Sequence, residues 1–225
     1  MSAKDPKTNA SHFATSNYAI FDTLNIDYVG QFTDKSYILV IIDTFTRWTE
    51  LFWCADADAD ADADAKSAAV CLIAHFGRFG PPNMIRSDRG SHFANDMIKE
   101  FLDLCGTSHN LTLANSKQEN AIVERVNKGV NGHPRGDKQT LEGYAKSIPF
   151  VQRIINSSVN RRTGVCPAHL LFWKKLDLSC GVLTPHLSVG TQSRSTYISD
   201  LISGQDKILD TAVQSLIKAD AKYAA

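Results

Sequence analysis

The sequence MIRSDRGSHFANDMIKEFLDLCGTSHNLTLANSKQENAIVERVNKGVN, residues 84–131, decides the fold class and the candidate site. Its first half is a short apolar segment ending in the acid Asp88, then a glycine-containing turn and a helical pattern over 95–105. Its second half is a strand pattern over 108–114, a polar loop and a helix with Glu124 near its start. The stretch therefore predicts two strand–helix units that each carry a carboxylate near a strand end or a helix start.

A third acid, Asp27, lies in the middle of an apolar strand pattern over 21–29. A carboxylate in a half-buried strand costs free energy unless a partner compensates its charge. Each acid considered alone has an ordinary structural explanation, because charged residues are mostly exposed. Asp27 could lie on an edge strand, Asp88 could cap a turn or a helix, and Glu124 could lie on a solvated helix face. If the three acids meet, they need a cation, and hard oxygen ligands select Mg²⁺ or Mn²⁺ over zinc.

The spacing and the flanking residues of these acids together resemble the catalytic core of retroviral and Ty3/gypsy-like retrotransposon integrases. Asp27, Asp88 and Glu124, with 35 residues between the last two, match the family's D,D(35)E constellation. The matching flanks are Gly80-Pro81-Pro82, Ser87-Asp88-Arg89-Gly90-Ser91-His92-Phe93, Gln118, Asn120, Val123-Glu124-Arg125, Asn127 and, downstream, residues 156–172. The similarity covers about residues 20–173, most of the chain.

The resemblance implies an α/β chain with a ribonuclease-H-like fold, a mixed five-stranded sheet flanked by helices. In that fold the first and fourth strands are neighbours, which would bring Asp27 beside Asp88. Asp27, Asp88 and Glu124 would be both the catalytic residues and the ligands of two Mg²⁺ or Mn²⁺ ions. Gln118 and Asn120, in the loop before Glu124, and Asn127 and Lys128, one helical turn after it, would contact DNA; a solvated Lys128 is an equal alternative.

The implied function is DNA integration by metal-dependent polynucleotidyl transfer. A DDE-type integrase of this kind trims the 3′ ends of element DNA and joins them to target DNA. One alternative is a decayed, integrase-derived protein that only binds DNA or assembles. Another alternative is a ribonuclease-H-type nuclease, but such an enzyme should not contain the motif Val123-Glu124-Arg125 followed by Asn127.

Several residues around Glu124 depart from the family's pattern. Lys117 stands where proline is usual, Ala121 where glycine is usual and Asn115 where an aromatic residue is common. The helix of Glu124 should also end early, because interior glycines cost about 1 kcal/mol each and an interior proline about 3 kcal/mol. The breaking residues are Gly129, Gly132, Pro134 and Gly136. These departures leave open whether the integrase activity of this chain is weak or absent.

Hydrophobic periodicity divides the chain into three parts. Residues 1–19 are polar and without periodicity, which predicts a flexible lead-in. Residues 20–175 form the expected core, with antiparallel strands over 21–29, 37–43 and 47–54, a strand over 83–87, and helices over 66–78, 141–159 and 167–172. The strict Ala-Asp alternation over 55–65 is interpreted as a surface insertion. Residues 176–225 are a C-terminal extension with an amphipathic helix over 196–221.

Composition excludes some classes of protein and permits others. The net charge is zero, but five of the 24 acids lie in the Ala-Asp repeat, which leaves a modest basic excess that permits DNA binding. Five cysteines without a CxxC pair favour reduced thiols and argue against a zinc knuckle. We expect an intracellular protein, nuclear or cytoplasmic, released from or part of a polyprotein. Its partners would be element-end DNA, target DNA and further copies of itself, with neither a membrane nor a nucleotide cofactor.

Overall fold

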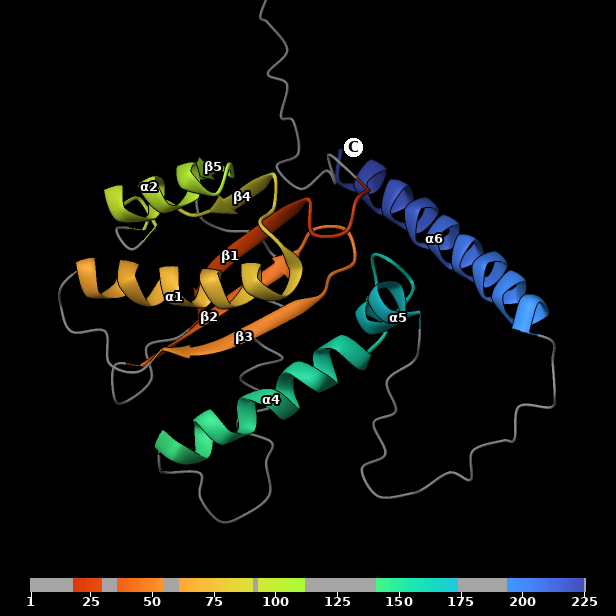
Figure 1. Cartoon of the computed structure of the whole chain (residues 1–225), viewed down its shortest axis with the longest axis horizontal. Helices are drawn as coiled ribbons and strands as arrows, with labels where there is room; N and C mark the ends of the chain where they lie inside the picture. The colour runs from red at the N-terminus through yellow and green to blue at the C-terminus, as the bar shows by residue number, and fades with distance from the viewer. Residues whose placement is uncertain are drawn as a thin grey trace, which may run out of the picture.

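A five-stranded mixed sheet forms the centre of the molecule (Figure 1). The computed structural model describes residues 18–29, 36–54, 61–90, 93–111, 141–173 and 194–224. The strands are β1 (Thr23–Val29), β2 (Tyr37–Asp43), β3 (Thr49–Cys54), β4 (Met84–Ser87) and β5 (Ser108–Leu111). Their order across the sheet is β3-β2-β1-β4-β5. The predicted mixed sheet of the ribonuclease-H-like fold is thereby confirmed.

The first three strands form an antiparallel meander, as their short connections predicted. β1 pairs with β2 from Leu24 opposite Asp43 to Val29 opposite Ile38, and β2 pairs with β3. β4 then joins β1 in parallel, and β5 joins β4 in parallel. This crossover makes the first and fourth strands neighbours, which confirms the arrangement expected from the resemblance.

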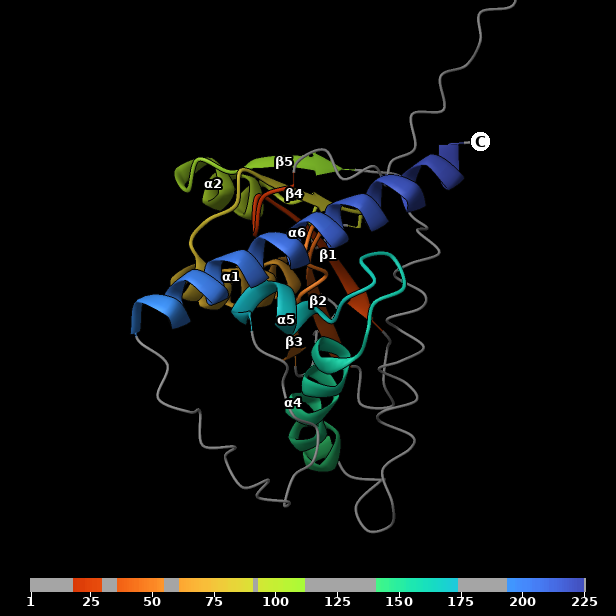
Figure 2. The same ribbon diagram turned by 90° about the vertical axis from the view of Figure 1, so that its right-hand side faces the viewer.

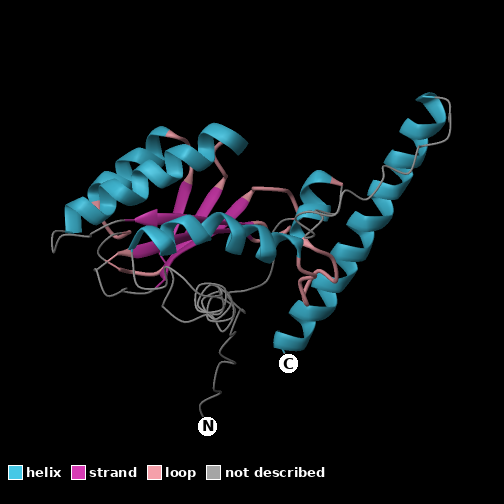
Figure 3. Cartoon of the chain, turned by 90° about the horizontal axis from the view of Figure 1, so that it is seen from below, coloured by secondary structure: helices cyan, strands magenta, loops and turns pink. Residues whose placement is uncertain are grey.

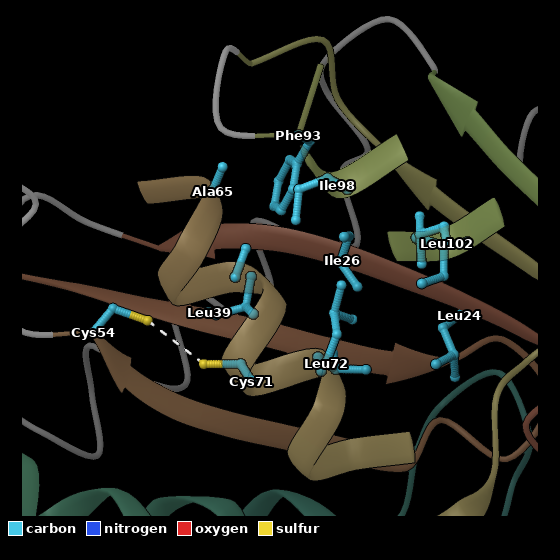
Figure 4. Close-up of a cluster of buried hydrophobic side chains, with 13 residues drawn as sticks. Leu24, Ile26, Leu39, Cys54, Ala65, Cys71, Leu72, Phe93, Ile98 and Leu102 are labelled. Atoms are coloured by element: carbon cyan, nitrogen blue, oxygen red, sulfur yellow. Dashed lines mark hydrogen bonds between the residues drawn. The ribbon is translucent and has the colours of Figure 1, made fainter. Parts of the chain in front are cut away.

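Two helices cover one face of the sheet. These are α1 (Ala61–Phe79) and α2 (Asp96–Leu104). Figure 4 shows Leu24, Ile26 and Leu39 of the strands gathered with Leu72 of α1 and Ile98 and Leu102 of α2. All six side chains are buried, so this face is a continuous apolar core. Asn95 begins α2 by accepting a hydrogen bond from the main-chain N–H of Met97, and Gly106, at φ +69°, follows its C-cap Cys105.

The helix α4 (Leu141–Ser157) covers the opposite face and one edge of the sheet (Figure 3). Ile148, Val151 and Ile155 pack against β2 and β3, with Pro149 exposed within the same helix. Asn156 accepts the N–H of Thr49 at 2.9 Å and donates to the Thr49 carbonyl at 2.7 Å. Gln152 accepts the N–H of Leu51 at 2.9 Å. The main chain of the edge strand β3 is thus bonded by helix side chains in the way that a neighbouring strand would bond it.

The last helices stand at one end of the sheet. They are α5 (Pro167–Phe172), which packs Phe172 edge-on against Trp48, and α6 (Arg194–Ala224). Figures 1 and 2 show α6 beside the β2–β3 turn and α5. Asp220 of α6 forms an ion pair with Arg162, and Leu216 is fully buried. No helix in the described ranges is long and apolar enough to span a membrane.

Several predicted boundaries differ from the structure by two or three residues, and the start of α1 differs most. The helix α1 begins at Ala61, five residues before the predicted start, so residues 61–65 of the Ala-Asp repeat are helical. Ala65 is fully buried in the core, which a surface insertion would not allow. Alanine is the best helix former, and acids near a helix start interact favourably with its dipole, so this sequence can extend a helix that packing has already formed. Residues 55–60 of the repeat lie outside the described residues.

Candidate active site

Asp27 lies on β1, and Asp88 is the first residue after the neighbouring parallel strand β4. The pairing of β1 with β4 ends with Asn25 opposite Arg86, and Asp27 and Asp88 each lie two residues beyond that pair. Side chains alternate between the faces of a strand. Ile26 points into the core beneath α1 and α2, so Asp27 projects from the opposite face of the sheet. Both acids are half-buried.

Asp27 is held by the strand that carries it. Its Oδ1 accepts a hydrogen bond from the main-chain N–H of Tyr28 at 2.8 Å. The Tyr28 ring points the other way, where it stacks on Phe93 with centroids 5.3 Å apart and meets Tyr37 edge-on. The aromatic contacts anchor the strand directly beside the acid, so Asp27 projects from a rigid part of the sheet.

Asp88 begins the turn after β4, and two hydrogen bonds hold it there. Its Oδ1 accepts the N–H of Gly90 at 3.0 Å, which closes a small turn. Its main-chain carbonyl accepts the hydroxyl of Ser87 at 3.0 Å. The same hydroxyl lies 2.8 Å from Nε2 of His109 on β5, and burial lowers the pKa of that imidazole, which favours its neutral form.

The carboxylates of Asp27 and Asp88 are suitable ligands for a hard divalent cation. Two carboxylates on neighbouring strands repel each other unless a positive charge lies between or near them. Carboxylate oxygens are the ligands that Mg²⁺ and Mn²⁺ prefer, and nitrogen or sulfur ligands would be needed to favour zinc. Arg86 lies on the same face, half-buried, and burial lowers the pKa of its guanidinium. The donor set of this face therefore suits an oxygen-bound ion.

The remaining predicted site residues lie outside the described residues. These are Glu124, the third acid, and Gln118, Asn120, Asn127 and Lys128, the predicted DNA contacts. The predicted early end of the Glu124 helix falls in the same gap. Within the described ranges, His, Cys, Asp and Glu side chains form no cluster of three or more that could hold a metal ion. The structure therefore places two of the three predicted acids, Asp27 on β1 and Asp88 directly after β4.

A second group of charged side chains is structural. Glu50 of β3 is buried, and its Oε2 contacts His75 Nδ1 at 2.7 Å and Arg78 Nη2 at 2.9 Å. The rings of Phe21 and Phe79 enclose the imidazole. The carboxylate is already paired and sealed under aromatic side chains, so this group connects β3 to α1 and offers no reactive face.

Comparison with known proteins relates the chain to integrases. Residues 19–117 match the Integrase core domain family, a range that includes Asp27 and Asp88 and ends before Glu124. The chain is 29% identical over 185 residues to the Gag-Pol polyprotein of walleye dermal sarcoma virus, which covers 80% of this chain and 9% of that polyprotein. Residues 19–117 are therefore similar to a retroviral-type integrase core domain. Ty3/gypsy membership in particular stays a prediction.

Other relatives agree with this integrase core assignment. The chain is 31% identical over 141 residues to the Gag-Pol polyprotein of feline leukemia virus, covering 60% of this chain and 8% of that protein. The chain spans less than a tenth of the polyproteins that it matches. A chain of the simian T-cell lymphotropic virus intasome in complex with PP2A regulatory subunit B56 gamma has the same fold. Its TM-score is 0.52 at 14% identity, over 77% of this chain and 62% of that one.

Ser87 and His109 were not among the residues predicted for the integrase core site. Ser87 directly precedes Asp88, which is the only signal in the sequence that it matters. His109 lies 22 residues after Ser87, in a strand whose register with β4 cannot be read from the sequence pattern. Only the pairing of β4 with β5 brings the two side chains into contact.

Proposed function

We propose that this chain performs DNA integration by metal-dependent polynucleotidyl transfer, in which element 3′ ends are trimmed and joined to target DNA. The observation that carries the proposal is the position of Asp27 and Asp88. Asp27 is on β1 and Asp88 directly follows the adjacent parallel strand β4, each two residues beyond the last pair of the ladder, in the range similar to an integrase core domain. Glu124 is proposed as the third acid on the strength of its spacing and flanking residues.

In this proposal the protein supplies ligands and rigidity, and no covalent nucleophile. When bound, two Mg²⁺ or Mn²⁺ ions would stabilise the attacking and leaving oxygens of an in-line phosphoryl displacement. Asp27, held by the Tyr28 N–H, and Asp88, held by the Gly90 N–H, would hold these ions together with Glu124. Carboxylates fixed before the substrate arrives need no reorganisation during the reaction.

The other parts of the proposal concern DNA and assembly. Gln118, Asn120, Asn127 and Lys128 would border the DNA end beside Glu124, and the chain would act as a homo-oligomer within the cell. Its relatives are Gag-Pol polyproteins, which supports an origin in a polyprotein. We also propose a division into a lead-in over 1–19, a core over 20–175 and a helical extension over 176–225; the range matched by the family, 19–117, lies almost wholly within the proposed core.

A strand-transfer assay tests the proposal. A pool of labelled duplexes with randomised ends is incubated with supercoiled plasmid, the full chain and Mn²⁺ or Mg²⁺, and the label joined to plasmid is measured and sequenced. We expect metal-dependent joining by the wild type and background joining by Asp27→Asn and Asp88→Asn. Asp103→Asn, which changes an exposed acid on α2, is the matched control and should join DNA as the wild type does.

Two outcomes would contradict the proposal. Equal joining by Asp88→Asn and the wild type would remove Asp88 from the reaction. Metal binding and DNA binding by the wild type without any joining would favour the alternative, an integrase-derived protein that binds or assembles without catalysis.

A further inference from the structure

The turn after β4 holds Asp88 beyond the end of the strand ladders. The pairing of β4 ends at Arg86 against β1 and at Ser87 against β5. Asp88 therefore depends on bonds from side chains and from the turn to keep its position. Two of these bonds are the Gly90 N–H to Oδ1 and the Ser87 hydroxyl to the Asp88 carbonyl.

The Ser87 hydroxyl has one proton, and it contacts both the Asp88 carbonyl at 3.0 Å and His109 Nε2 at 2.8 Å. Both contacts are satisfied at once only if His109 carries its proton on Nε2 and donates to Ser87 Oγ, which in turn donates to the Asp88 carbonyl. Ser87 is 3% exposed, so water does not compete strongly for this hydroxyl.

The geometry points to His109 as a positioning residue for the candidate metal site, acting on Asp88 through the Ser87 hydroxyl. His109 is fixed on β5, opposite Ile85 of the core. The relay therefore connects the Asp88 main chain to the neighbouring strand at a place where the backbone ladder has ended. This inference rests on the proposed role of Asp88 as a metal ligand.

If His109 positions Asp88, the affinity of the site for a cation depends on His109 even though His109 does not contact the cation. Partners that orient a metal ligand typically change metal affinity by about 10–100-fold when they are removed. Because Ser87 bonds the main chain of Asp88 and not its carboxylate, we expect the lower end, on the order of tenfold. The relay is a single chain of two bonds, so losing either bond should have nearly the same effect as losing both.

Mn²⁺ titration of the full chain tests the relay. The measured quantity is the Kd of the binding event that Asp88→Asn abolishes. His109→Phe and Ser87→Ala should each raise this Kd on the order of tenfold, and the double variant should raise it no further. Ser87→Thr retains the hydroxyl and His109→Gln retains a side-chain N–H, so both should restore an affinity near that of the wild type.

A matched control separates positioning from general loosening of β5. Ser108→Ala, at the position directly before His109, removes a hydroxyl that donates to the Asn83 carbonyl at 2.8 Å, before β4 and away from Asp88. It should leave the Mn²⁺ Kd unchanged. Melting temperatures in the presence of a chelator show whether each variant folds. If His109→Phe does not fold, Ser87→Ala decides the question, because it removes a single oxygen.

The possible failures are distinguishable. Suppose that Asp88→Asn abolishes Mn²⁺ binding but neither Ser87→Ala nor His109→Phe changes the Kd. This result would overturn the relay and would not affect the proposed function. Binding that is unchanged in Asp88→Asn would overturn the metal site and the relay together. A Kd raised equally by Ser108→Ala would also overturn the relay, because the effect would then belong to the strand as a whole.

Discussion

At the scale of residues, the two candidate ligands are each fixed by a main-chain N–H close in sequence. Tyr28 donates to Asp27, and Gly90 donates to Asp88. A carboxylate oxygen has more than one lone pair, so these bonds orient the acids and still leave oxygen capacity for a cation. Local bonds of this kind form as soon as the strand and the turn form, which gives the site a defined shape before any ligand arrives.

Gly164 is a residue whose backbone excludes other side chains. Its φ is +71°, and a Cβ there would lie 3.3 Å from Ser215 Oγ on α6. We expect Gly164→Ala to lower the free energy of unfolding by about 1–2 kcal/mol, the cost of a left-handed conformation for an ordinary residue. Urea denaturation measures this change.

Gly77 is the matched control for Gly164. It lies within α1, and a Cβ there meets no atom within 4 Å. Gly77→Ala should therefore raise the free energy of unfolding by up to about 1 kcal/mol, since alanine is the better helix former. Two changes of the same sign would contradict this account of the two glycines.

At the scale of elements, the edge strand β3 depends on side chains of α4. Asn156 is 1% exposed and bonds both the N–H and the carbonyl of Thr49. An uncovered strand edge presents unpaired main-chain groups to other molecules, and α4 prevents this at β3. The helix therefore has two roles, since it also closes the apolar core on that face.

Asn156→Ala should destabilise the fold by about 3 kcal/mol, because two buried main-chain groups lose their partners at about 1–3 kcal/mol each. Ser157→Ala, the next residue, removes only an exposed hydroxyl bonded to the Arg153 carbonyl and is the control. Urea denaturation of both variants checks the difference. Similar small losses for the two would show that α4 does not hold the edge of β3.

The elements were more predictable than the contacts between them. The apolar run over 37–43 and the short helix over 167–172 match β2 and α5 at both ends, because periodicity and turn residues mark them. The start of α1 was missed, because the Ala-Asp alternation has a strand period and its helical form depends on the packing of Ala65. The neighbouring positions of β1 and β4, the strands of Asp27 and of the residues before Asp88, followed from the expected strand order. The contact between Ser87 and His109 could not be predicted in this way, because it depends on the register of β4 with β5.

At the scale of the whole molecule, α6 belongs to the same folded body as the sheet. Leu216 and Ala212 are fully buried, and Asp220 pairs with Arg162. Arg47, in the turn after β2, is buried nearby, and burial together with the positive Arg162 lowers its pKa to about 10, while Asp43 and Asp220 oppose this shift. The C-terminal helix therefore completes the end of the domain where the β2–β3 turn and α5 meet.

Leu216→Ala should lower the free energy of unfolding by about 2–5 kcal/mol, the cost of a large-to-small change in a core. Ile217→Ala is the neighbouring control, since that side chain is 44% exposed, and it should cost within about 0.5 kcal/mol. Denaturation followed by the fluorescence of Trp48, at the β2–β3 turn, reports the loss in the sheet. A Trp48 transition that is insensitive to Leu216→Ala would mean that α6 folds apart from the sheet.

The central claim is that Asp27 and Asp88 hold one divalent-cation site, and paramagnetic broadening by Mn²⁺ tests it most directly. In ¹H–¹⁵N correlation spectra of the full chain, substoichiometric Mn²⁺ should broaden the Tyr28 and Gly90 amides together, because each donates to one of the two carboxylates. The Asp103 amide on α2 should stay sharp, and Asp88→Asn should abolish the broadening at both positions. Broadening of Gly90 without Tyr28, or of both in Asp88→Asn, would contradict a shared site.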